Sequence, residues 1–179
     1  MREDGWKRMS EKTSKPKIEE IITDVLDDDA LDNALDFVAF LRANKLSPRW
    51  ASLNAWAVSY RNQRICYIRV SGTAHYHNLE DGAWHINHVN YGQTNLVEDE
   101  NEQCIPDKKL RDIVWNNVKY CAKCYNCKPG NIVTVFEKQF NEVCHSWLTM
   151  KNPNTEILNC AKKIVLMRKQ SIANKKSVG

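Results

Sequence analysis

The N-terminal part of the chain repeats its apolar residues at the spacing of α-helices. Apolar side chains recur every three or four residues between positions 18 and 26, and again between positions 31 and 41. The acidic run Asp27–Asp29 separates the two repeats and can cap the second helix, which ends near Asn44 before Ser47-Pro48. This pattern predicts an N-terminal helical hairpin.

The pattern changes to alternation, which is typical of strands, after residue 50. Apolar residues alternate with small or polar ones over 56–60, and again over 66–70 after the turn-like sequence RNQR. A further stretch, WHINHVNY at 84–91, has the composition of a strand. We therefore predict a small antiparallel sheet of about three strands.

The remainder returns to helical spacing. Apolar residues between 110 and 118 predict a helix that runs into a cysteine-rich segment, and those of 140–148 predict another after the β-prone sequence IVTVF. Asn154 can cap a last helix over 157–165. The predicted fold class is α+β: the helical hairpin, the small sheet, and C-terminal helices around a Cys-rich metal knuckle.

The domain organisation follows from the same pattern. Residues 1–15 are predicted to be a flexible arm, and residues 16–170 a single α+β domain with the Cys knuckle at 121–144. Residues 171–179 are predicted to be a basic tail. A chain of 179 residues is long enough to bury a core without disulfides.

Three cysteines are spaced three residues apart in the sequence CAKCYNCKPG, at Cys121, Cys124 and Cys127. Zinc prefers four ligands in a tetrahedron, and thiolates are among its usual ligands. Cys144 completes the spacing C-x2-C-x2-C-x16-C and is the best fourth candidate, with His145 as an alternative. We therefore predict a structural Zn²⁺ site at Cys121, Cys124, Cys127 and Cys144.

Other interpretations of the cysteines stay open. The C-x2-C-x2-C sequence also begins the ligand run of bacterial ferredoxins, so an Fe–S cluster is the alternative cofactor. A redox-active pair is expected at a helix N-terminus, whereas these cysteines follow a predicted helix C-terminus. The thiols can also be buried apolar groups, as we expect for Cys66 and Cys160, whereas Cys104 is predicted to be an exposed free thiol.

The histidines offer weaker candidates for metal binding. His85 and His88 are three residues apart on a predicted strand, so they are expected on opposite faces of the sheet and not at a common metal. His75 and His77 could share a face, but no third ligand is evident.

Aromatic residues cluster on the predicted strands. The simplest interpretation is that they form the core between sheet and helices, and the alternative is a ligand cleft with an aromatic wall. The candidate ligand-binding residues are Trp56, Tyr60, Tyr67 and Trp84.

Charge and composition limit the classes of function. The net charge is +4, but the positive excess lies at the two ends, and residues 18–160 carry a net charge of −5. This distribution argues against an extended nucleic-acid surface, although the tail could contact phosphate. No apolar run reaches the roughly 20 residues that cross a membrane, and the charged N-terminus has no signal core, so we expect a cytoplasmic protein. The chain has no G-x-S-x-G, no H-E-x-x-H and no Gly-rich phosphate loop, which favours a non-enzymatic role.

Several segments together carry a resemblance. ALDFVAFLRANKLSP, W-x-V-x-Y, ICYIRV, VWNNVKYC-x2-C-x2-C-x-PG, F-N-x-V-C and NPN resemble small uncharacterised proteins of Gram-positive anaerobic bacteria, from about Ile18 to Arg168. The resemblance implies a bacterial cytosolic origin and no established activity. Those proteins read GKEF where this chain reads EKQF, and the missing glycine argues against a tight turn at Glu137.

The sequence thus predicts an interaction, regulatory or small-molecule-binding domain with a structural zinc, acting on a protein partner or ligand that the sequence does not identify. The alternative is an Fe–S electron carrier that uses the same cysteines.

Overall fold

The computed structural model describes residues 15–52, 54–70, 82–88, 108–122 and 130–174. The helices and strands, in chain order, are α2 (Ile18–Val25), α3 (Asp28–Ala43), β1 (Arg49–Ser52), β2 (Ala55–Tyr60), β3 (Gln63–Val70), β4 (Trp84–His88), α4 (Lys108–Asn116), β5 (Val118–Tyr120), β6 (Asn131–Val135), β7 (Lys138–Lys151) and α5 (Thr155–Asn174).

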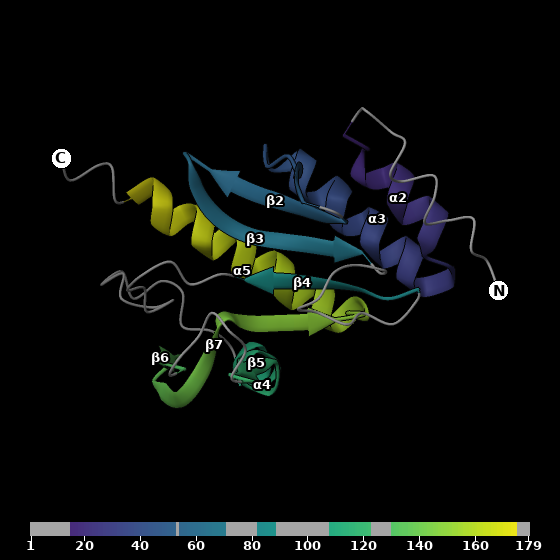
Figure 1. The fold of residues 1–179 in the computed structure, drawn as a ribbon. Coiled ribbons are helices and arrows are strands. Elements are labelled where there is room, and N and C mark those ends of the chain that lie inside the picture. The colour runs from purple at the N-terminus through teal and green to yellow at the C-terminus, as the bar shows by residue number, and fades with distance from the viewer. Residues whose placement is uncertain (1–14, 53, 71–81, 89–107, 123–129, 175–179) are drawn as a thin grey trace.

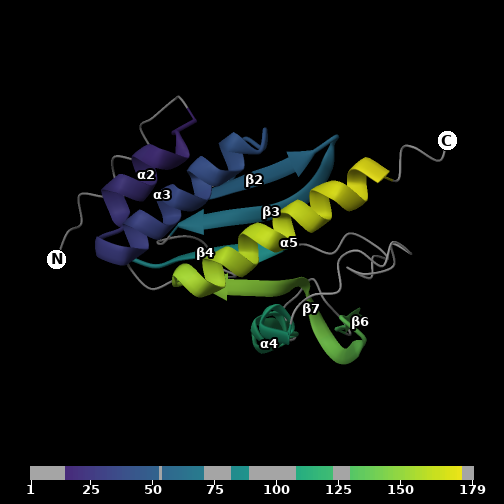
Figure 2. The ribbon, with the colours of Figure 1, turned by 180° about the vertical axis from the view of Figure 1, so that it is seen from behind.

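The seven described strands form one antiparallel sheet. Its order is β1-β2-β3-β4-β7-β5, and β6 pairs with β7 outside this order. Helices α2, α3 and α5 lie over one face of the sheet, as the two opposite views show (Figure 1, Figure 2). The opposite face, which is turned toward the viewer in Figure 1, has no described helix in front of it. Within the described ranges, no helix is both long and apolar enough to cross a membrane.

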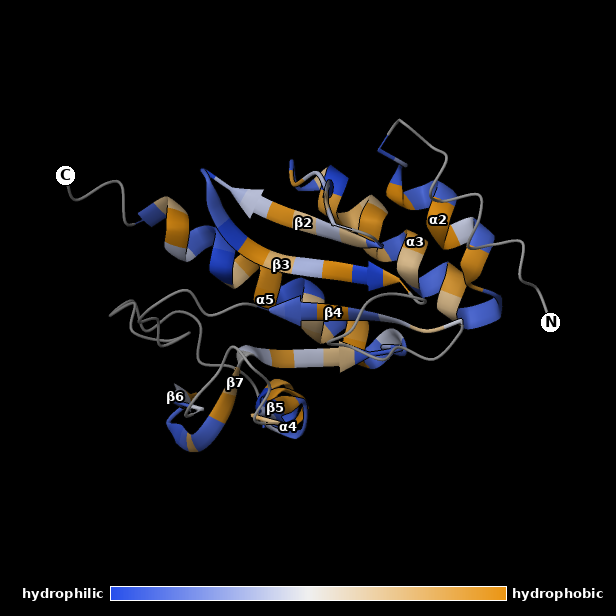
Figure 3. Cartoon of the chain, viewed as in Figure 1, coloured by the Kyte–Doolittle hydropathy of each residue, from blue (hydrophilic) through white to orange (hydrophobic). Residues whose placement is uncertain are grey.

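The hydrophobic core lies between the sheet and these three helices. The apolar side of α2 is buried through Ile18, Ile21 and Ile22. The ring of Phe37 in α3 lies 6.3 Å from that of Trp84 in β4. Apolar and polar segments alternate along β3, as expected for a strand that turns one side to the core (Figure 3).

Two tight turns have both central residues in the left-handed region. Arg61 (φ 46°) and Asn62 (φ 63°) connect β2 to β3, where RNQR predicted a turn, and Phe136 (φ 48°) and Glu137 (φ 67°) connect β6 to β7. This geometry matches the twist of paired strands. The expectation that Glu137 disfavours a tight turn was therefore wrong.

The predicted helix over 140–148 was also wrong, because these residues belong to the 14-residue strand β7. Glu142 has a φ of 55°, and the pairing of β7 with β5 and β6 shifts register nearby. Such an irregularity interrupts the alternation of a strand. It leaves adjacent buried pairs, Val143 with Cys144 and Trp147 with Leu148, at a spacing that imitates a helix.

The predicted fold class was wrong as a whole. The sheet has seven strands instead of about three, and residues 118–120 form strand β5 instead of the end of a helix. Within the part of the chain that the structure describes, no metal knuckle surrounded by helices is seen. Among the described residues, no group of three or more His, Cys, Asp or Glu side chains could hold a metal ion.

The end of the folded chain lies beyond residue 170. Helix α5 continues to Asn174, and Ile172 is 1% exposed in the core. Asn154 caps this helix, as predicted, by accepting a hydrogen bond of 2.9 Å from the backbone N–H of Ile157.

Candidate functional site

The sheet face opposite the helices carries two rows of polar side chains. Arg69 of β3 pairs with His85 of β4, and His85 pairs with Lys151 of β7, so three basic residues lie side by side across three strands. We call these three residues the basic row. Neighbouring strands are about 4.8 Å apart, so the row spans about 10 Å.

A second row lies two residues away on the same strands. Tyr67 pairs with Asn87, and Asn87 pairs with Thr149. We call these three residues the neutral row. In β2, Ala55 and Ala57 lie at the ends of the basic and neutral rows, so small side chains border Arg69 and Tyr67 there.

Asn87 and His85 are buried, with 1% and 2% of their surfaces exposed. Asn87 Nδ2 lies 3.0 Å from His85 Nε2, within hydrogen-bond distance. Asn87 Oδ1, in contrast, is buried and has no hydrogen-bond partner. Leaving a buried acceptor unsatisfied costs about 1–3 kcal/mol, so a native protein that keeps one calls for an explanation.

Arg69 is a second polar group whose hydrogen bonding is incomplete. Its Nε is buried and has no hydrogen-bond partner. Its guanidinium lies 5.8 Å from the centre of the Tyr67 ring, and that of Arg64 lies 4.8 Å from the same ring. Burial lowers the pKa of Arg69, and the neighbouring Tyr67 partly opposes this. A desolvated guanidinium is unfavourable unless it is paired, and an anion pairs with it best.

The described residues of this face carry a net positive charge. The described residues of β1 to β4, and the C-terminal part of β7 from Val143 to Lys151, include no Asp or Glu. Arg49 of β1 pairs with Ala57, so a further cation lies in line with the neutral row, in the edge strand of the sheet. Arg69 and Lys151, the two permanent cations of the basic row, lie on either side of His85.

His88 lies next to Asn87 in sequence but on the helix-covered face, since successive strand residues alternate. It pairs with Cys66 and Leu148 and is 3% exposed. Burial lowers the pKa of His88 from 6.5 to about 4, and a hydrogen bond with the Ile65 backbone partly opposes this. His88 is therefore a neutral core residue at pH 7, and it lies on the opposite face from His85, as the spacing predicted.

The structure does not bring the four predicted aromatic ligand residues together. Trp56 and Trp84 are buried in the core at 1% and 0% exposure. Tyr60 lies under α5, where the Lys169 Nζ is 5.4 Å from its ring centre. Among the four, Tyr67 alone belongs to the polar face.

The described cysteines of the predicted zinc site lie at one end of the sheet. Cys121 follows strand β5, and its N–H donates a 2.6 Å hydrogen bond to the Glu142 carbonyl. A Cβ on Gly130 would be 2.5 Å from the Glu142 carbonyl carbon, so the chain also returns to this point of β7. Both ends of the segment 122–130 therefore lie against β7 within two residues of Cys144, which is 8% exposed.

The other predicted metal or thiol residues are placed only in part. Cys124, Cys127, Cys104, His75 and His77 lie outside the described residues. Cys66 and Cys160 are buried, as predicted, at 0% and 6% exposure. The argument that Cys121 follows a helix C-terminus was wrong, because the preceding element is β5.

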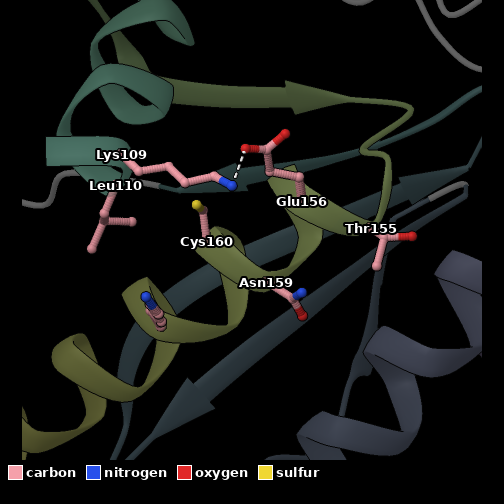
Figure 4. Close-up of a pocket in the computed structure, with 7 residues that line it drawn as sticks. Lys109, Leu110, Thr155, Glu156, Asn159 and Cys160 are labelled. Carbon is pink, nitrogen blue, oxygen red and sulfur yellow. Dashed lines mark ion pairs between the residues drawn. The ribbon is translucent and has the colours of Figure 1, made fainter. Parts of the chain in front are cut away.

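A cleft of about 690 Å³ between α4 and α5 is the next candidate (Figure 4). Lys109 and Glu156 form an ion pair of 2.6 Å across it, and Cys160 points toward it from α5. Lys109 and Glu156 neutralise each other, and Lys163 adds one further positive charge to the lining. The lining holds no buried polar atom without a hydrogen-bond partner, so this cleft is a weaker site than the sheet face.

Comparisons of the chain with known protein families, with curated proteins and with solved structures find no match. The function is therefore inferred from the site itself. The polar face was missed by the sequence analysis, although WHINH alternates two polar residues, His85 and Asn87, with the apolar Trp84 and Ile86. That alternation is the signal that could have identified it.

Proposed function

We propose that this protein is a non-enzymatic binding protein that holds a small polar ligand on the sheet face formed by the basic and neutral rows. The observation that carries this proposal is the buried Asn87 Oδ1, which has no hydrogen-bond partner beside a buried histidine. A binding site keeps such destabilising groups because they contribute to affinity for the ligand.

The composition of the face favours binding over catalysis. The described residues of the two rows provide hydrogen-bond donors and acceptors and positive charge, but no cysteine, serine or carboxylate. Nucleophilic catalysis needs an activated nucleophile beside a base, and hydrolysis by acid–base pairs usually needs carboxylates. The hydroxyl of Thr149 is directed to the Ser146 carbonyl, 3.4 Å away, and not to His85.

Thermal unfolding with a ligand panel tests the proposal. A ligand that binds the native state alone stabilises it by about 2.7 kcal/mol at 100 times its Kd, which raises Tm by about 5–10 °C for a chain of this size. The panel should contain carboxylates, phosphate esters, amino acids, sugars and nucleosides.

Two neighbouring variants make the test specific. Asn87→Ala removes a buried polar group from the ligand face, and His88→Gln changes an equally buried residue on the opposite face. We expect Asn87→Ala to abolish the ligand-induced rise in Tm and His88→Gln to retain it. If no panel member stabilises the wild-type protein, or if both variants respond like it, the proposal is wrong.

We also propose that Cys121, Cys124, Cys127 and Cys144 bind a structural Zn²⁺, with Zn–S distances of about 2.3 Å. The support comes from the spacing and from the approach of both ends of the segment 122–130 to β7 beside Cys144. Four thiolates would leave no open position for catalysis. An Fe–S cluster held by the same residues is the alternative.

Elemental analysis of anaerobically purified protein separates these cofactors. We expect a colourless protein with one zinc per chain, and Cys144→Ser should lose the metal and melt at a lower temperature. Cys160→Ser is the matched control, since that buried cysteine lies on α5, and it should keep the zinc. Iron with visible absorption would favour the cluster, and a metal-free protein of normal stability would contradict both.

A further inference from the structure

We propose that the ligand of the sheet face is an anion, a carboxylate or a phosphate, that is bound by the basic row of Arg69, His85 and Lys151. This inference rests on the proposed binding function and adds the charge of the ligand and the residues that recognise it.

The first argument is the balance of charge. Arg69 and Lys151 flank His85 across three adjacent strands, and β1 to β4 supply no acid among their described residues. An anion bound between Arg69 and Lys151 is attracted by both of these permanent cations. A cationic ligand would be repelled by both side chains, and a neutral ligand would gain neither attraction.

The second argument is the chemistry of Arg69. Its guanidinium can donate five hydrogen bonds in a planar fork that matches two oxygens of a carboxylate or phosphate. The Tyr67 ring lies 5.8 Å from this guanidinium and supports it on one side, while Nε stays buried without a hydrogen-bond partner. An anion would satisfy that donor and replace the hydration that the guanidinium has lost.

The third argument concerns the Asn87 amide. In the present orientation its Nδ2 lies beside His85 Nε2, and Oδ1 has no partner. A neutral imidazole can carry its proton on Nε2, and that N–H then donates. The amide then turns by 180°, an orientation of the same shape, so that its oxygen accepts from His85 and its NH₂ donates to the anion. The anion therefore gains donors from both rows.

Titration calorimetry and thermal unfolding with succinate, inorganic phosphate and succinamide test the charge requirement. Succinamide has the shape of succinate without its charge, and phosphate distinguishes the two classes of anion. We expect succinate or phosphate to bind with an affinity that falls as salt rises, and succinamide to bind at least tenfold more weakly.

Three variants locate the anion. Arg69→Gln should weaken binding about tenfold or more, since it removes a charge-assisted hydrogen bond. Lys151 is exposed at the end of the row, so Lys151→Gln should fold normally and weaken binding a few-fold. Lys163→Gln, on α5 at the α4–α5 cleft, removes the same charge on the other side of the sheet and should leave binding unchanged.

The outcomes separate this inference from the proposed function. If neutral members of the panel bind through Asn87 while both anions fail, the anion inference is overturned and the binding function stands. If Lys163→Gln weakens binding as much as Lys151→Gln, the anion is held by general surface charge or in the cleft, and the inference is also overturned. If neither anions nor neutral compounds bind, both proposals are wrong. A carboxylate of the chain itself that pairs with the basic row would give this result.

Discussion

Acidification is expected to destabilise this protein through His88. The side chain is buried on the helix-covered face, and its pKa is lowered by burial from 6.5 to about 4. The unfolded chain therefore binds a proton more readily than the native one, and stability falls as pH decreases through the window between these two values. Above pH 6.5, both states are neutral at His88 and its contribution to stability is fully present.

The magnitude follows from the two pKa values. The loss of unfolding free energy from this residue alone is about 2 kcal/mol at pH 5 and about 3 kcal/mol at pH 4, relative to pH 8. His88→Gln keeps a polar side chain that can donate to the Ile65 backbone but cannot titrate in this range.

Urea unfolding of both proteins between pH 8 and pH 4.5 measures this contribution. The difference in unfolding free energy between wild type and His88→Gln should change by about 2.5 kcal/mol across the series, in favour of the variant at low pH. Other groups that titrate cancel in this difference. A difference that stays constant with pH would show that His88 has an ordinary pKa in the folded protein, and that its environment is not the dry core described above.

Three further changes test the fold. Glu137→Gly should raise the unfolding free energy by about 0.5–1 kcal/mol, because Glu137 has a φ of 67° that glycine adopts without strain, and an unchanged or lower urea midpoint would contradict the turn. Gly130→Ala should lower the unfolding free energy by about 2 kcal/mol or more, since the added Cβ would lie 2.5 Å from the backbone of Glu142. Normal stability of this variant would refute that close approach. Truncation after residue 174 should leave Tm unchanged. Truncation after residue 170 removes the buried Ile172 and should lower the unfolding free energy by about 2 kcal/mol. Equal melting temperatures of the two truncated proteins would contradict the packing of the last helical turn.

Local patterns were sufficient where one periodicity ran through a whole element. The apolar repeats of α2, α3 and α5 and the alternation in β2, β3 and β4 predicted those elements near their observed positions. Each of them packs one continuous side against the core, so the sequence carries its period directly.

The pattern failed where tertiary contacts decide the structure. Strands β1 and β5 have four and three residues, too few for an alternation to be recognised. The irregularity at Glu142 changes which residues of β7 face the core, so its buried positions imitate a helix. The polar face was missed for a related reason, because the basic row is formed by pairing of Arg69, His85 and Lys151 from strands distant in sequence.

The most direct test of the sheet face as a ligand site is an NMR titration that observes its side-chain N–H groups. Arg69 Nε–H and the Asn87 side-chain amide can be assigned in ¹⁵N spectra of the wild-type protein by their loss in Arg69→Gln and Asn87→Ala. On addition of the anion that binds best, we expect both signals to shift along one saturable curve. The control is the indole Nε1–H of Trp115 in α4, which donates to the Val135 carbonyl, and its signal should not shift. Binding that moves the Trp115 signal but neither Arg69 nor Asn87 would place the ligand elsewhere and contradict the assignment of the sheet face.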